Sequence, residues 1–97
     1  MLLTRQKLQE KREAIFEIAR RYGAHDVRIF GSVARGDATG ESDLDLVVRF
    51  DPGRTLLDQG GLLMDLRSFL GMKVDVVSEG ALTGRFGIIV RQEAVPL

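Results

Sequence analysis

Several features are missing from this 97-residue chain, and each absence narrows its function. It contains no cysteine, which excludes a disulfide framework and a thiolate metal site. Lys and Arg together number 14, as do Asp and Glu, so no global basic field attracts nucleic acid or a membrane surface. We therefore expect neither direct nucleic-acid binding nor membrane association.

Long hydrophobic runs are missing too. No apolar run approaches the roughly 20 residues needed to span a bilayer, and the chain becomes charged at Arg5, too early for a signal peptide. These absences favour a cytoplasmic protein. The length suits a single domain over residues 1–97, and 44% hydrophobic with 29% charged residues is ordinary globular composition.

Apolar periodicity predicts two long helices. The first runs from about Thr4 to Tyr22 and is ended by Gly23, a residue suited to a left-handed cap. The second runs over residues 55–70 and is ended by Gly71 in the same way. The dense mixed charge of the first helix favours a solvated face, with a partner-docking helix as the alternative.

Two adjacent glycines complicate the second helix. Gly60 and Gly61 each destabilise a helix by roughly 1 kcal/mol relative to alanine. Either they allow another backbone to come close or the regular helix begins after them, near Leu62, and we favour the second interpretation. The predicted core stripe of this helix is Leu56, Leu63, Leu66, Phe69 and Leu70.

Short apolar runs predict three strands, at residues 27–30, 43–50 and 73–77. The short link over residues 31–42 suits antiparallel neighbours, whereas the long second helix permits a parallel crossover. Strands that alternate with helices predict a layered α/β (α+β) fold, in which helices pack on a mixed sheet.

The carboxyl-terminal tail gives weaker signals. Gly80, Gly84 and Gly87 disfavour a helix before Ile88. Residues 88–93 are compatible with a helix or an extended segment. Residues 94–97 suit a short final strand or coil.

Two carboxylates open the second predicted strand. Because side chains alternate faces along a strand, Asp43 and Asp45 point the same way, while Leu44, Leu46 and Val48 point into the core. Two acids held side by side repel each other, so folding alone rarely favours them without a cation between them. Magnesium binds carboxylate oxygens and leaves positions open for phosphate oxygens.

A Gly-Ser turn follows the first predicted strand. Gly31 lets backbone N–H groups approach a ligand closely, and Ser32 adds a hydroxyl. A short helix over residues 32–35 would point its N-terminus at bound phosphate. Arg35 and Arg49 are near enough in sequence to contact phosphate, and a solvated surface position is the equal alternative. The turn and the two acids together predict a metal and triphosphate site.

These motifs resemble a known family. Gly31-Ser32, ten intervening residues and Asp43-Leu44-Asp45 resemble the signature of polymerase-beta-type nucleotidyltransferases. The finer pattern, residues 31–36 followed by Ser42 and the two acids, resembles minimal nucleotidyltransferases, short prokaryotic proteins of which many are antitoxins paired with HEPN-domain ribonuclease toxins. The resemblance implies the nucleotidyltransferase fold.

It also implies roles for five residues. Asp43 and Asp45 would bridge two magnesium ions, and Asp75 would complete one metal site as base or only as ligand. Gly31 and Ser32 would hold the β- and γ-phosphates of ATP. The structural alternatives are an exposed edge-strand position for Asp75 and a turn role for Ser32.

The function implied by the resemblance is transfer of AMP from ATP to a hydroxyl of a HEPN toxin. The alternatives are an antitoxin that neutralises its partner by binding alone and an enzyme that modifies a small molecule such as an aminoglycoside. We expect the partner to contact residues 37–41 and the tail after Leu82. Both a homo-oligomer and a hetero-oligomer are compatible with the sequence.

Overall fold

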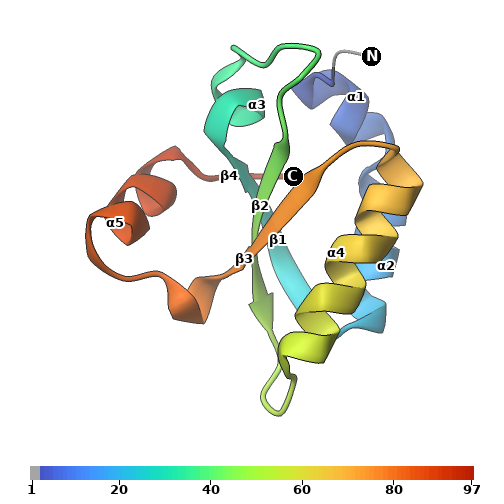
Figure 1. The fold of residues 1–97 in the computed structure, drawn as a ribbon, viewed down its shortest axis with the longest axis vertical. Coiled ribbons are helices and arrows are strands. Elements are labelled where there is room, and N and C mark those ends of the chain that lie inside the picture. Colours follow the sequence, from blue (N-terminus) through green and yellow to red (C-terminus); the bar gives the residue numbers. More distant parts are fainter. Residues whose placement is uncertain (1–2) are drawn as a thin grey trace.

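The strands form one four-stranded mixed sheet with helices on both faces (Figure 1). The computed structural model describes residues 3–97. In chain order the elements are α1 (Arg5–Glu10), α2 (Arg12–Arg21), β1 (Ala24–Phe30), α3 (Gly31–Arg35), β2 (Leu44–Phe50), α4 (Leu56–Leu70), β3 (Val74–Ser78), the 3-10 helix η1 (Glu79–Ala81), α5 (Gly84–Glu93) and β4 (Val95–Pro96). The predicted fold class is confirmed.

The strand order is β3-β2-β1-β4. β1 pairs antiparallel with β2 on one side and with β4 on the other. β2 pairs parallel with β3, and α4 forms the crossover between them. The prediction of one antiparallel link and one parallel crossover is therefore confirmed, and the end of the chain is a short strand.

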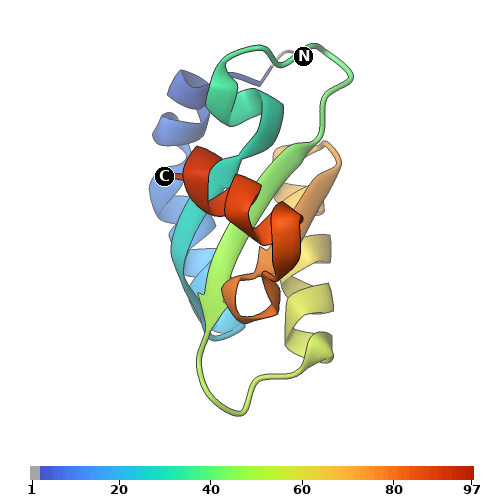
Figure 2. The same cartoon turned by 90° about the vertical axis from the view of Figure 1, so that its left-hand side faces the viewer.

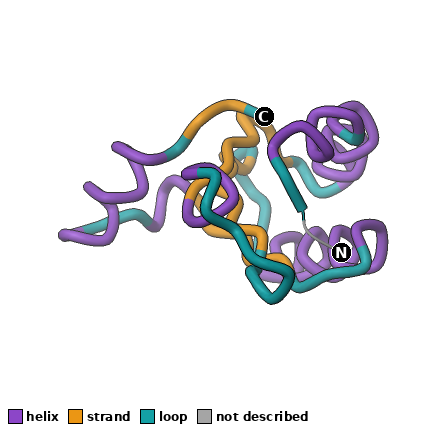
Figure 3. The backbone as a smooth tube through the Cα atoms, turned by 90° about the horizontal axis from the view of Figure 1, so that it is seen from above, coloured by secondary structure: helices purple, strands orange, loops and turns teal. Residues whose placement is uncertain are grey.

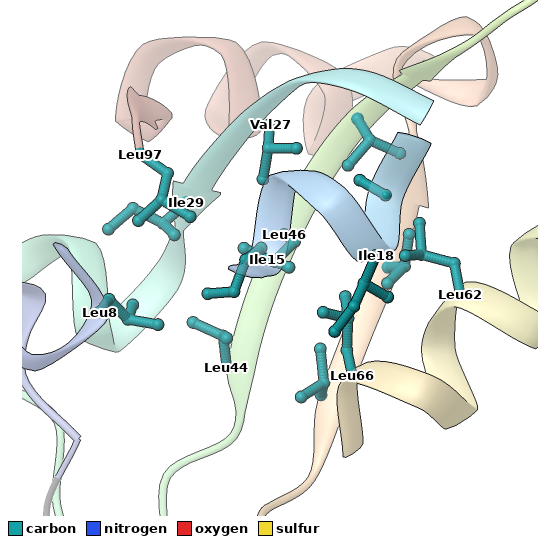
Figure 4. Packing of buried hydrophobic residues seen from close by; sticks show 14 of the residues in the cluster. Leu8, Ile15, Ile18, Val27, Ile29, Leu44, Leu46, Leu62, Leu66 and Leu97 are labelled. Atoms are coloured by element: carbon teal, nitrogen blue, oxygen red, sulfur yellow. The ribbon is translucent and has the colours of Figure 1, made fainter. Parts of the chain in front are cut away.

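The main core lies between the sheet and α1, α2 and α4 (Figures 1 and 4). Leu8, Ile15 and Leu66 of these helices belong to one buried cluster with Leu44 and Leu46 of β2 (Figure 4). A smaller cluster lies on the opposite face, under α5 (Figures 2 and 3). Its buried members are Phe30, Val47, Leu82 and Val90.

The first predicted helix is two helices, so that prediction is corrected. The N–H of Lys11 bonds to the carbonyl of Leu8 at 3.0 Å, a tight turn that separates α1 from α2. Leu8 and Ile15, on either side of the turn, are both fully buried. The predicted ends are confirmed, because Thr4 caps α1 and Gly23 after α2 has a φ of 72°.

The favoured start of α4 near Leu62 is wrong. The helix begins at Leu56 because Thr55 and Asp58 form a capping box, in which the Thr55 N–H donates to the Asp58 carboxylate at 2.9 Å. This box offsets the weak helix propensity of the two glycines. A Cβ on Gly61 would collide with the ring of Tyr22, so the close neighbour is a side chain rather than a backbone.

The predicted core stripe of α4 is partly wrong. Leu66 is buried as expected, but the other fully buried residue of the helix is Leu62. Leu56 and Phe69 are exposed. At roughly 100° per residue, the line through Leu62 and Leu66 leaves Leu56 well to one side.

The tail is more helical than the glycines suggested. α5 begins at Gly84, ahead of the predicted Ile88. Gly84 has a φ of 61°, which suits glycine at the entry to the helix. A Cβ on buried Gly87 would lie 3.0 Å from the Leu82 carbonyl carbon, so this glycine allows α5 to pack closely on the preceding loop.

Candidate active site

The five predicted site residues lie near one another where β1, β2 and β3 are side by side. Asp45 of β2 is in register with Phe30 at the end of β1 and with Asp75 of β3. Gly31 and Ser32 directly follow Phe30 and open α3. Asp43 immediately precedes β2.

The predicted alternation of faces in β2 is confirmed. Leu44, Leu46 and Val48 are buried in the main core. Asp45 therefore points to the opposite face, together with its register partner Asp75. Both carboxylates are partly exposed, on the face of the sheet that α5 covers only in part (Figure 2).

Gly31 and Asp45 are in direct contact. Gly31 has a φ of 78°, a conformation that favours glycine, and a Cβ there would collide with the Oδ2 atom of Asp45. The absent side chain therefore leaves room for the carboxylate beside the turn. The neighbouring Ser32 hydroxyl forms no hydrogen bond within residues 3–97 and is free to bind a ligand.

The charges of two neighbouring carboxylates act on Asp45. The pKa of Asp45 is raised above its ordinary value, first by burial and then by the negative charges of Asp75 and Asp43. The positive charge of Arg35 opposes this shift. A bound cation would remove the repulsion.

Two basic residues, which the sequence analysis did not single out, lie beside the acids. Lys73 Nζ is 3.6 Å from Asp43, and Arg67 is 3.7 Å from Asp75. Arg67 also donates a hydrogen bond of 3.0 Å to the Val74 carbonyl. The spacing of Lys73 and Asp75 places both on one side of the chain, but the contact of Lys73 with Asp43 depends on the pairing of β3 with β2, for which the sequence has no local signal.

Oxygen donors of this kind suit magnesium. Within residues 3–97, no three Asp, Glu, His or Cys side chains are grouped closely enough to hold a metal ion. Asp43 and Asp75 are turned toward Lys73 and Arg67 instead. The donor chemistry and the raised pKa of Asp45 fit a cation, and binding would require the two outer carboxylates to turn away from their basic partners.

The two arginines singled out by sequence differ in position. Arg35 donates hydrogen bonds to Glu93 of α5 at 3.1 Å and to Asp37 at 3.2 Å. Its positive charge also acts to lower the pKa of Asp45. Arg49 lies 3.5 Å from Asp26 and is engaged away from the acids. Only Arg35 belongs to the surroundings of the carboxylates.

Ser42, directly before the first acid, orders the loop that leads to it. Its hydroxyl accepts a hydrogen bond of 2.8 Å from the Thr39 N–H, and its own N–H bonds to the Thr39 carbonyl at 3.1 Å. The loop from α3 is thereby closed just before Asp43. Sequence reasoning used Ser42 only as part of the motif.

The site lies outside the cavity that the structure forms elsewhere. That cavity, of about 620 Å³, lies between α2, the start of β1 and the end of the chain. None of the five predicted residues lines it. Outside this cavity, the side chains of Asp43 and Asp75 retain 36% and 47% of their accessible surface.

Comparison with known proteins identifies the fold and the family. Residues 11–95 match the sequence family described as nucleotidyltransferase domain. The chain belongs to this family. A protein adenylyltransferase MntA from Thermococcus cleftensis is 34% identical over 79 residues, which are 81% of this chain and 80% of that protein. The predicted nucleotidyltransferase activity is thus supported by both family and relatives.

Comparison with solved structures supports the same fold. A protein provisionally named as a minimal nucleotidyltransferase is 48% identical, with a TM-score of 0.85 over 98% of this chain and 97% of that one. A toxin–antitoxin structure with AMP-PNP has the same fold, with a TM-score of 0.75 and 21% identity, over 87% of this nucleotidyltransferase and 69% of the other chain.

No helix within residues 3–97 is long and apolar enough to cross a membrane.

Proposed function

We propose that this nucleotidyltransferase uses magnesium to move AMP from ATP to a hydroxyl of a HEPN-type partner protein, and so acts as its antitoxin. The observation that carries the proposal is the register of Asp45 with Asp75, beside the Gly31 turn. The relative from Thermococcus cleftensis is named a protein adenylyltransferase. Structures that share the fold include an MNT antitoxin in complex with a tri-AMPylated HEPN toxin of Shewanella oneidensis.

Each site residue has a role in this reaction. Asp43, Asp45 and Asp75 would hold two magnesium ions, which neutralise charge on the triphosphate and favour ionisation of the acceptor hydroxyl. Gly31 and Ser32 would orient the β- and γ-phosphates. These contacts would place the α-phosphorus where an acceptor hydroxyl could attack it.

The transfer makes one bond and breaks one. The acceptor oxygen bonds to the α-phosphorus of ATP, and the bond from that phosphorus to the bridging oxygen breaks. Pyrophosphate leaves with the bonding electrons. The hydroxyl proton passes to Asp75 or to water, and the two routes differ in whether Asp75 is a base as well as a ligand.

The partial exposure of the Asp43 and Asp75 carboxylates supports a macromolecular acceptor. A small acceptor such as an aminoglycoside needs a pocket to orient it, whereas the 620 Å³ cavity includes none of the predicted site residues. The close approach of Gly31 to the Asp45 carboxylate and the raised pKa of Asp45 support an active enzyme over a binding-only antitoxin. A protein that only bound its partner would have no need for either.

Intact-mass spectrometry tests the proposal. The chain is incubated with ATP, magnesium and a HEPN-domain protein, taken from the neighbouring gene if that gene encodes one, and Asp45→Asn serves as the matched inactive variant. We expect the partner to gain one or more adenylyl groups when it is incubated with the wild type and none when it is incubated with Asp45→Asn. If its mass is unchanged while Asp45→Asn still neutralises it, the binding-only function replaces this proposal.

A further inference from the structure

α5 exposes three large apolar side chains. Phe86, Ile88 and Ile89 retain 55%, 57% and 45% of their accessible surface. The same helix attaches to the sheet through Gly87 and Val90, which are buried. Packing in this chain therefore accounts for one side of α5 and leaves the other uncovered (Figure 2).

The exposed side of α5 is continuous with the catalytic face. The ring of Phe86 contacts Phe30 edge to face, with centroids 6.3 Å apart, and Phe30 is the register partner of Asp45. At the other end of the helix, Glu93 bonds to Arg35 of α3. A protein seated on α5 would thus lie next to the carboxylates.

The unpaired charges on α5 itself are of one sign. Arg85 and Arg91 are exposed on α5 and form no ion pair with any residue of 3–97. Glu93, the acid of the helix, is already paired with Arg35. An apolar surface flanked by arginines complements a partner surface that is apolar and acidic. A second copy fits less well, because a symmetric contact would bring two arginine-bearing faces together.

We infer that the acceptor protein docks on the exposed side of α5, which is formed by Arg85, Phe86, Ile88, Ile89 and Arg91. The acceptor contacts this surface through an apolar segment that also carries acidic residues. The inference rests on the proposed function and adds where the acceptor binds and by what chemistry. Docking there holds the acceptor hydroxyl over Asp45 and Asp75. This contact brings the acceptor hydroxyl close to the site, which a small domain without an acceptor-binding module cannot do alone.

Paired substitutions test the surface. Ile88→Asp with Ile89→Asp places acid on α5. Leu56→Asp with Leu57→Asp makes the same change on α4, where both leucines are even more exposed and the helix covers the other face of the sheet. Steady-state adenylylation of the HEPN-domain protein gives KM for the acceptor and kcat, and a thermal shift with ATP and magnesium reports on the nucleotide site.

We expect the α5 pair to raise the acceptor KM at least tenfold, about 1.4 kcal/mol of binding, and to keep the ATP-induced thermal shift. The α4 pair should change the KM less than twofold. Arg85→Glu with Arg91→Glu, which leaves the apolar contacts in place, should also raise the KM and guards against misfolding of the α5 pair.

Equal KM values for the α5, arginine and α4 variants would overturn the docking surface while leaving the proposed function intact. A wild-type chain that never modifies the partner would overturn the proposed function, and the docking inference with it. The two failures are thus separate.

Discussion

At the scale of single residues, the missing side chain of Gly31 determines where Asp45 can lie. Gly31 and Gly36 stand at the two ends of α3 and have nearly the same backbone conformation, with φ of 78° and 82°. A Cβ on Gly31 would meet the Asp45 carboxylate, whereas a Cβ on Gly36 would meet nothing within 4 Å. The pair therefore separates backbone strain from contact with the site.

We predict that Gly31→Ala and Gly36→Ala each lower the free energy of unfolding by about 1–2 kcal/mol, because both force alanine into the left-handed region. Only Gly31→Ala should also lose nucleotidyl transfer, by about 100-fold or more, because it displaces Asp45. Chemical denaturation and the transfer assay measure the two effects. Equal activity in the two folded variants would show that contact between Gly31 and Asp45 is unimportant.

Asp45→Asn should reveal the repulsion among the acids. The folded protein holds the Asp45 proton more tightly than the unfolded chain, because its pKa is raised above 3.8. This group therefore favours folding at low pH, and its contribution falls as the pH rises from 3.8 through the folded pKa.

Without metal, Asp45→Asn should therefore be more stable than the wild type at pH 7, with the difference closing as the pH falls below about 4. Its transfer activity should drop by at least about 100-fold. Melting curves across this pH range provide the measurement. A variant that is less stable at every pH would contradict the proposed repulsion.

The position of Asp45 in the fold was easier to predict from the sequence than the contacts of its basic neighbours. The alternation of Asp45 with buried leucines follows from strand geometry, so its face could be predicted. Lys73 and Arg67 could not be assigned to the acids, because their contacts depend on how β3 and α4 lie beside β2. Long-range ion pairs of this kind have no local pattern in the sequence.

At the scale of elements, α4 shows why helix boundaries were harder to predict than helix existence. Propensity alone argued for a start after the two glycines, and the capping box at Thr55 overrode it. The break between α1 and α2 is similar, because Leu8 and Ile15 fit one continuous stripe as well as two separate helices. The start of α5 at Gly84 was missed because helix propensity counts Gly87 against a helix. In the structure, Gly87 allows α5 to pack closely on Leu82.

Gly60 and Gly61 should respond oppositely to alanine. A methyl group on Gly60 would have no neighbouring atom within 4 Å, so Gly60→Ala should stabilise the protein by roughly 0.5–1 kcal/mol through helix propensity. Gly61→Ala should destabilise it, because the Tyr22 ring must move and its hydrogen bond of 2.5 Å to Asp65 is disturbed. Denaturation midpoints compare the two, and a stabilised Gly61→Ala would contradict the packing of α2 on α4.

At the scale of the whole molecule, the main hydrophobic core and the proposed site lie on opposite faces of the sheet. The face under α1, α2 and α4 carries the main core, while the other carries Asp45, Asp75 and α5. The mixed topology was predictable from the lengths of the two connections. The placement of Phe86 against Phe30, which joins α5 to the site, was not, because it links two residues far apart in the chain.

Ligand binding should stabilise the whole fold. At a concentration about 100 times the dissociation constant, magnesium with ATP should add roughly 2.7 kcal/mol, or about 10–20 °C in Tm for a domain of this size. Asp45→Asn should show little of this shift, and sodium chloride at equal ionic strength should not reproduce it. Identical melting curves with and without magnesium and nucleotide would contradict the proposed metal and triphosphate site.

The most direct test of nucleotidyl transfer uses ATP labelled at different phosphates. The HEPN-domain partner is incubated with the wild-type chain, magnesium and ATP carrying the label on either the α- or the γ-phosphate. Attack at the α-phosphorus predicts that the partner acquires the α label, that the γ label leaves in pyrophosphate, and that Asp45→Asn transfers neither. A partner that acquires the γ label, or no label at all, would contradict the account.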